Sequence, residues 1–147
     1  MNILDDLRNR GLIEMVNTDR ARADQWLDDA ERHLEAARLI GELDPSGAYV
    51  LAYDAARKAV AAALLMDGHR VLSRPGAHRA LAEYSDWLAT ETGEQALARF
   101  DRMRRNRNQS EYGTRAFGEA EEEGAIDSTS PALWAWPSPR AACAMYI

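Results

Sequence analysis

The residues between Arg99 and Arg107 are the part of this sequence whose types point most directly to chemistry. They include five arginines and one aspartate, which gives a local charge of +4. The whole chain has a net charge of −6, so the remaining residues together carry −10. Non-specific nucleic-acid binding requires a broadly positive surface. The sequence therefore argues against that kind of binding and favours a local basic site.

Neutral polar groups follow these arginines at helical spacing. Tyr112 lies about one helical turn beyond Arg107 and Asn108, so the three side chains can share a helix face. A guanidinium fork matches phosphate bidentately, asparagine adds a donor and an acceptor, and tyrosine adds a hydroxyl and a stacking ring. We therefore predict a phosphodiester or nucleotide site in which Arg104, Arg105 and Asn108 bind phosphate. Tyr112 is not an obvious general base, because a phenol with a pKa near ~10 is protonated at pH 7.

A purely structural interpretation of the same segment is also open. Arginine-rich helix faces are commonly solvated, and arginines near a helix C-terminus interact favourably with the helix dipole. In that case the protein is a structural bundle whose arginines pair with the surrounding carboxylates.

Glycine and proline divide the chain into amphipathic helical segments, and no stretch alternates like a strand. We expect an all-α fold, an antiparallel bundle of four to five helices over residues 1–126. Asn17 or Thr18 is the expected cap of the second helix, and residues 67–75 are an expected loop. Residues 127–147 form an atypical tail that contains proline and tryptophan. The expected helices cover about residues 3–10, 18–40, 46–66, 75–89 and 94–112, with a short further helix at 115–126.

Composition narrows the class of protein further. Cys143 is the only cysteine, so no intramolecular disulfide can form. The three histidines are too scattered to give a metal-ligand spacing, and we predict neither a metal nor a cofactor. The longest apolar run, residues 59–66, is too short to span a bilayer, and the first residues lack the pattern of a signal peptide. We therefore expect a cytoplasmic protein that does not associate with a membrane.

The arginine-rich segment and several shorter patterns resemble the HEPN domains of bacterial toxin–antitoxin, defence and RNA-processing systems. The resemblance covers roughly residues 4–119. Its segments are Gly11 to Ile13, Ala30 to Ala37, Tyr53 to Ala59, Gly68 to Arg70 with His78, and Arg104 to Tyr112. It implies an up-and-down helical bundle that pairs into a homodimer.

In catalytic members of that family, an arginine is followed after a short spacer by a histidine. Two copies meet at the dimer interface and cleave RNA without a metal, because the histidine handles the proton of the attacking 2′-hydroxyl and the arginine stabilises the phosphorane charge. Counted from Arg107, the histidine position of this chain is occupied by Tyr112; counted from Arg105, it is Ser110. The better register implies Arg107 and Tyr112 as the catalytic positions.

The resemblance implies two alternative functions. The first is a HEPN-type component of a toxin–antitoxin or defence system, a dimer that binds and cleaves RNA. A nucleotidyltransferase-like antitoxin is then an expected partner, and Tyr112 is a candidate acceptor of nucleotide. The second is a non-catalytic module that binds a nucleotide or a protein, an alternative favoured by the missing histidine.

Two groups outside the arginine-rich segment are candidates for support. Asp54 lies one turn before Arg57, which predicts a local ion pair; the resemblance implies that it could instead orient an arginine of the motif. His78 is expected to cap or pack near a helix start. The alternative is that either His69 or His78 reaches the Arg107 site of its own or the partner subunit and replaces the missing base. Tyr53 is expected to be a core or dimer-interface aromatic.

Overall fold

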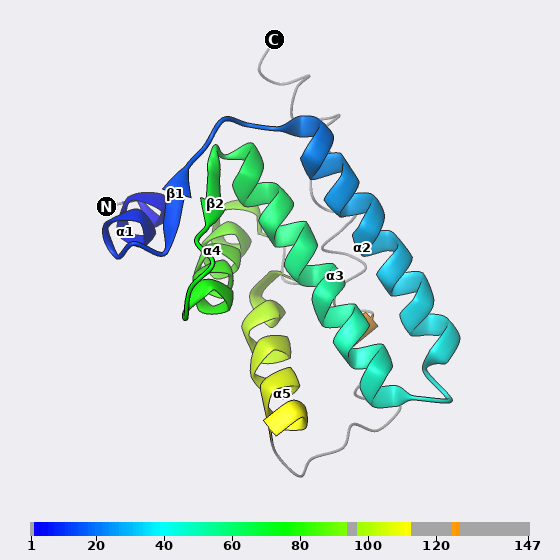
Figure 1. The fold of residues 1–147 in the computed structure, drawn as a ribbon. Coiled ribbons are helices and arrows are strands. Elements are labelled where there is room, and N and C mark those ends of the chain that lie inside the picture. The colour runs from blue at the N-terminus through cyan, green and yellow to red at the C-terminus, as the bar shows by residue number, and fades with distance from the viewer. Residues whose placement is uncertain (1, 94–96, 113–124, 127–147) are drawn as a thin grey trace.

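The computed structural model describes residues 2–93, 97–112 and 125–126, with side chains in the second of these segments as far as Gln109. The described residues are mostly helical, which confirms the expected all-α class (Figure 1). The α-helices are α1 (Ile3–Asn9), α2 (Arg20–Ile40), α3 (Pro45–Met66), α4 (Ala77–Thr92) and α5 (Phe100–Tyr112). The short elements are the strands β1 (Ile13–Met15) and β2 (His69–Val71) and the 3₁₀ helix η1 (Leu97–Arg99).

The starts of the long helices are set by aspartate caps. The Asp19 carboxylate accepts a hydrogen bond from the backbone N–H of Arg22 at 2.9 Å, and Asp44 does the same for Gly47 at 2.9 Å. A carboxylate at a helix N-terminus satisfies a free amide and interacts favourably with the helix dipole. The expected cap at Asn17 or Thr18 is therefore wrong, because Asp19 takes that role and α2 begins at Arg20.

A small antiparallel sheet corrects the expectation that the chain contains no strand. β1 pairs with β2 in the register Ile13↔Val71, Glu14↔Arg70 and Met15↔His69. β2 lies within residues 67–75, which were expected to form a loop. Strands of three residues are too short to display an alternating pattern. Their pairing depends on a contact between distant parts of the chain, including an ion pair between Arg70 and Glu14 at 2.6 Å.

Helix α3 is the centre of the fold. In Figure 1 it runs beside α2 on one side and faces α4 and α5 on the other, and it contacts all three. Its buried residues include many alanines, whose small side chains let neighbouring helices approach closely. Tyr49, Tyr53, Val60 and Leu64 are the larger buried side chains of this helix in the main core.

Buried polar contacts fix helix α4 against its neighbours. The Ser85 hydroxyl, fully buried, donates a hydrogen bond to the Leu97 carbonyl at 2.8 Å. Tyr84, equally buried, donates to the Asp67 carboxylate at 2.6 Å. The first bond attaches α4 to η1, and η1 leads directly into α5. Ser85 therefore helps to set where the arginine-bearing helix begins.

The ends of the predicted bundle are described only in part. Ala125 and Ile126 are buried in the main core, at the end of the expected 115–126 helix. The rest of that helix and the 127–147 tail lie outside the described residues. In the part of the chain that the structure describes, no helix is both long enough and apolar enough to cross a membrane.

Replacing Ser85 tests the attachment of α4 to η1. We expect Ser85→Ala to lower the free energy of unfolding by about 1–2 kcal/mol, because the Leu97 carbonyl loses its buried donor. Urea-induced unfolding followed by circular dichroism measures this. Ser73→Ala, at an exposed loop position, is the matched control and should change the stability little. Equal stabilities for the two variants would contradict the assignment.

Candidate phosphate-binding site

Two arginines of helix α5, Arg104 and Arg107, face the other helices, whereas Arg105 faces solvent. Phe100 and Met103 are buried, so this face of α5 packs against the neighbouring helices. Arg104 and Arg107 follow these two residues at intervals of four, which places them on the same face. The Arg104 side chain is 20% exposed, whereas that of Arg105 is 63% exposed and Asn108 is exposed. The predicted phosphate-binding set therefore divides into inward and outward members.

Tyr53 on α3 is the side chain that the inward face of α5 meets. Its ring is almost completely buried and stacks on Phe100, with centroids 5.4 Å apart and planes 8° from parallel. The guanidinium carbon of Arg107 lies 5.6 Å from the centroid of the Tyr53 ring. This is the range of a cation–π contact, which is strongest away from bulk water. The prediction that Tyr53 is a core aromatic is confirmed, and it also contacts Arg107.

His78 on α4 meets the same tyrosine from another side. Its Nδ1 lies 2.6 Å from the Tyr53 hydroxyl, and the two rings are stacked with centroids 6.0 Å apart. His78 is the second residue of α4, so the expectation that it packs near a helix start is confirmed. The alternative that a histidine reaches the Arg107 site also gains support for His78, because Arg107 and His78 both contact Tyr53. His78 is nevertheless exposed, so a ligand can reach its imidazole.

Burial, together with the nearby charges, keeps both His78 and Tyr53 in their neutral forms. Burial and the nearby cations Arg57, Arg107 and Arg104 lower the pKa of His78 from its usual value, against a smaller opposing effect of Asp54. Burial raises the pKa of Tyr53 to about 12, although the same arginines act in the opposite direction. At pH 7 the cluster therefore holds a neutral imidazole, a protonated phenol and three guanidinium groups.

We call Tyr53, Arg57, His78, Arg104 and Arg107 the arginine–histidine cluster. It combines residues from α3, α4 and α5. Its three positive charges face two carboxylates, Asp54 beside Arg57 and Asp101 beside Arg104. An anion that entered beside His78 would meet a local excess of positive charge and a neutral ring nitrogen. The arrangement therefore suits a phosphate group.

Asp54 holds Arg57 in place within the cluster. Its Oδ1 accepts hydrogen bonds from Arg57 at 2.6 and 2.9 Å, which confirms the predicted local ion pair. Its other oxygen lies 3.3 Å from Lys58 and 2.9 Å from His33 on α2. Burial by itself would raise the pKa of Asp54, but the two cations of α3 leave it below its usual value. Asp54 is thus ionised and joins α2 to the cluster.

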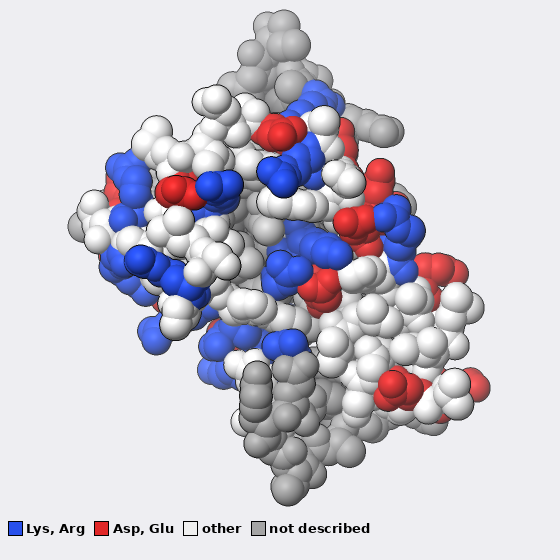
Figure 2. All heavy atoms as spheres, in the orientation of Figure 1, with Lys and Arg blue, Asp and Glu red and all other residues white. Residues whose placement is uncertain are grey.

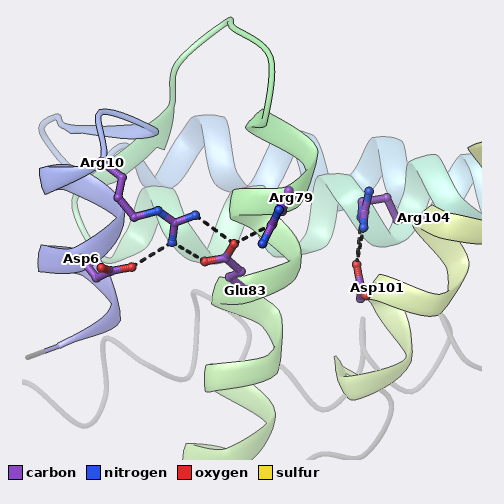
Figure 3. A network of polar contacts seen from close by, with 6 residues as sticks. All are labelled: Asp6, Arg10, Arg79, Glu83, Asp101 and Arg104. Atoms are coloured by element: carbon purple, nitrogen blue, oxygen red, sulfur yellow. Dashed lines mark hydrogen bonds and ion pairs between the residues drawn. The ribbon is translucent and has the colours of Figure 1, made fainter.

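A groove of about 630 Å³ adjoins the cluster on the side of α1 and α4. Its walls carry both signs of charge (Figure 3). Arg104 donates to Asp101 at 2.9 Å, and Arg105 lies 3.4 Å from the same carboxylate. The structural interpretation, in which arginines pair with carboxylates, therefore holds for Arg104 and Arg105. The remaining lining residues are Arg10, Arg79, Ala82, Glu83 and Asp86.

An ion-pair network forms the far wall of this groove. Glu83 on α4 accepts hydrogen bonds from Arg10 at 2.5 and 3.0 Å and from Arg79 at 3.1 Å. Arg10 also donates to Asp6 at 2.9 Å. These contacts attach α1 to α4 (Figure 3). Acidic and basic side chains are likewise intermixed over the face seen in Figure 2, which agrees with a local rather than a broad basic site.

Some predicted site residues lie outside this geometry. Tyr112 ends helix α5, but its side chain lies outside the described residues, so its assigned role stays a prediction. Among the described residues, no three side chains of His, Cys, Asp or Glu are grouped to hold a metal ion. Sequence reasoning missed Tyr53 and Arg57 as site residues. Their spacing of four on α3 was a signal of a shared face, but it did not indicate which helix that face meets.

Comparison of the chain with protein-family models, with curated proteins and with solved structures finds no match.

The cations of the cluster should lower the pKa of the His78 imidazole by a measurable amount. We expect the imidazole to titrate below its ordinary pKa, and Arg107→Gln to move that pKa upward, because one nearby positive charge is lost. NMR of the imidazole C–H resonances over pH 4–9 measures both values. Arg70→Gln, which changes an arginine on β2 paired with Glu14, is the matched control and should leave the His78 titration unchanged. An unshifted pKa in the unmodified protein would contradict the described charge environment.

Proposed function

We propose that this protein is a HEPN-type component of a toxin–antitoxin or defence system that binds RNA and cleaves it without a metal. The observation that carries the proposal is the meeting of Arg107 and His78 at the buried ring of Tyr53. An arginine of the α5 motif and an accessible histidine are the two residue types that this chemistry requires.

The charge of the cluster supports a phosphodiester as the ligand. Arg57, Arg104 and Arg107 all act on His78, and their combined charge exceeds that of Asp54 and Asp101 together. A bound phosphate would offset that excess, and guanidinium groups bind phosphate oxygens through paired hydrogen bonds. The negative charge of the rest of the chain repels nucleic acid elsewhere on the surface, so binding would be confined to this site.

The resemblance adds an arrangement of subunits to this proposal. It implies a homodimer in which two copies of the α5 motif face one another, and a nucleotidyltransferase-like antitoxin as a partner. Tyr112 is then the candidate acceptor of nucleotide beside the motif.

A non-catalytic module for a nucleotide or a protein is the second candidate. The observation that favours it is the mixed charge of the groove, where Arg104 and Arg105 are both engaged by Asp101. Such a surface complements a partner that carries both signs of charge. This candidate keeps the arginine–histidine cluster for binding and has no cleavage step.

RNA binding tests the shared basis of the two candidates. We expect a labelled single-stranded RNA to bind in EDTA, and Arg107→Ala to weaken the affinity by on the order of tenfold, because a charge-assisted contact to phosphate is lost. Fluorescence anisotropy over a range of salt concentrations measures this, and the variant should reduce the salt slope by about one.

The control for this experiment is Arg70→Ala, which removes an exposed arginine from β2 without touching the cluster. Its affinity for RNA should equal that of the unmodified protein. Equal weakening by Arg70→Ala and Arg107→Ala would indicate a diffuse electrostatic contact and contradict the site. Gel analysis of the same RNA then separates the candidates, since cleavage in EDTA supports the ribonuclease and intact RNA supports the module.

A further inference from the structure

We propose that His78, supplied by α4, is the catalytic residue that takes the proton from the RNA 2′-hydroxyl, with Tyr53 as its positioning residue. The inference rests on the proposed function and assigns the proton transfer within it. The catalytic histidine would then lie on α4, whereas the arginine motif lies on α5. On α5, Tyr112 occupies the position that is a histidine in catalytic members of the family.

The geometry of the imidazole supports this role. Its Nδ1 is engaged by the Tyr53 hydroxyl at 2.6 Å, and parallel stacking on Tyr53 fixes the plane of the ring. The opposite nitrogen, Nε2, is therefore the one that faces a ligand. Because His78 is exposed while Tyr53 is buried, the pair presents a fixed base to solvent from a rigid support.

A tyrosine hydroxyl can keep its hydrogen bond to a histidine both before and after the imidazole gains a proton. The phenol can either donate or accept a hydrogen bond. With the proton on Nδ1, the imidazole donates to the Tyr53 oxygen and leaves the lone pair of Nε2 available. When Nε2 gains a proton, the same bond remains and orients the imidazolium. A base that is oriented by a third group is the common arrangement in nucleophilic and acid–base catalysis.

The surrounding charges suit both the base and the charge that forms during the reaction. Arg57 and Asp54 of α3 and Arg104 and Arg107 of α5 all act electrostatically on His78. Burial and the net positive charge of these groups together lower the pKa of His78, so its imidazole is neutral at pH 7. The same arginines stabilise a phosphate that becomes more negative as it is attacked.

The proposed step is balanced as a transesterification. Nε2 of His78 accepts the proton of the 2′-hydroxyl while the 2′-oxygen forms a bond to the adjacent phosphorus. The bond between phosphorus and the 5′-oxygen breaks, and that oxygen takes a proton from water. The imidazolium of His78 gives its proton to the hydroxide that remains, which restores the neutral base. The products are a 2′,3′-cyclic phosphate and a 5′-hydroxyl end, and no oxidant, reductant or metal takes part.

The decisive experiment compares binding and cleavage in the same variants. For an RNA in EDTA, we expect His78→Ala to lower kcat by about 100-fold or more while leaving the Kd within about threefold. Tyr53→Phe should lower kcat by on the order of tenfold, because it releases the imidazole but keeps the ring under Arg107. Arg70→Gln, which changes an exposed arginine on β2 paired with Glu14, is the matched control and should retain full activity.

Two further readouts separate catalysis from a structural effect. The logarithm of kcat/KM should rise with pH through a midpoint below the usual histidine value of about 6.5, and this limb should be lost in His78→Ala. Added imidazole should restore part of the activity of His78→Ala, since the site of the side chain is open to solvent. A 2′-deoxy substitution at the cleaved nucleotide should abolish cleavage without loss of binding.

The outcomes distinguish failure of this inference from failure of the proposed function. Arg107-dependent cleavage that persists undiminished in His78→Ala and in His78→Gln would overturn the role of His78 and leave the ribonuclease proposal standing. Binding of RNA without cleavage by the unmodified protein would overturn both the inference and the ribonuclease, in favour of the binding module. Absence of RNA binding would overturn the proposed function itself.

Discussion

The buried ring of Tyr53 is the contact on which the arrangement of α3, α4 and α5 depends. The ring stacks on Phe100 and makes a cation–π contact with the guanidinium of Arg107, and the hydroxyl forms a hydrogen bond with His78. These three interactions use both the aromatic ring and the hydroxyl of one side chain. An aromatic residue with a polar end can satisfy all of them while it fills core volume. The position of each candidate site residue is therefore coupled to the packing of the core.

Gathering three arginines at one end of a small bundle has an electrostatic cost, and the structure limits it in two ways. Asp54 and Asp101 each engage a nearby arginine at hydrogen-bond distance. The cluster is also open to solvent at His78, which lowers the repulsion between the cations. Burial and the same cations together keep His78 neutral. The positive charge of the cluster thus favours both anion binding and a neutral imidazole.

Helix α4 is held by directional polar contacts as well as by its buried apolar side chains, among them Leu81 and Leu88. Ser85 joins it to η1, Tyr84 joins it to Asp67, and Glu83 joins it to α1. The many buried alanines of α3 let neighbouring helices approach closely. Directional hydrogen bonds help to set the register of α4. They fix α4, and with it His78, relative to the arginines of α5.

The sequence by itself determined the helical class, the approximate extent of the helices and the identity of the arginine motif, because these depend on local spacing and on residue type. It also indicated the Asp54–Arg57 pair, whose members are one helical turn apart. Only the tertiary structure decided that Arg104 and Arg107 face inward while Arg105 and Asn108 face outward. It also decided that Tyr53 and His78 meet and that β1 pairs with β2. These features join residues far apart in the chain, and a local pattern does not specify which faces of two helices will pack together. The sequence identified the arginine motif, but only the packing of α3, α4 and α5 showed that His78 is the histidine close to it.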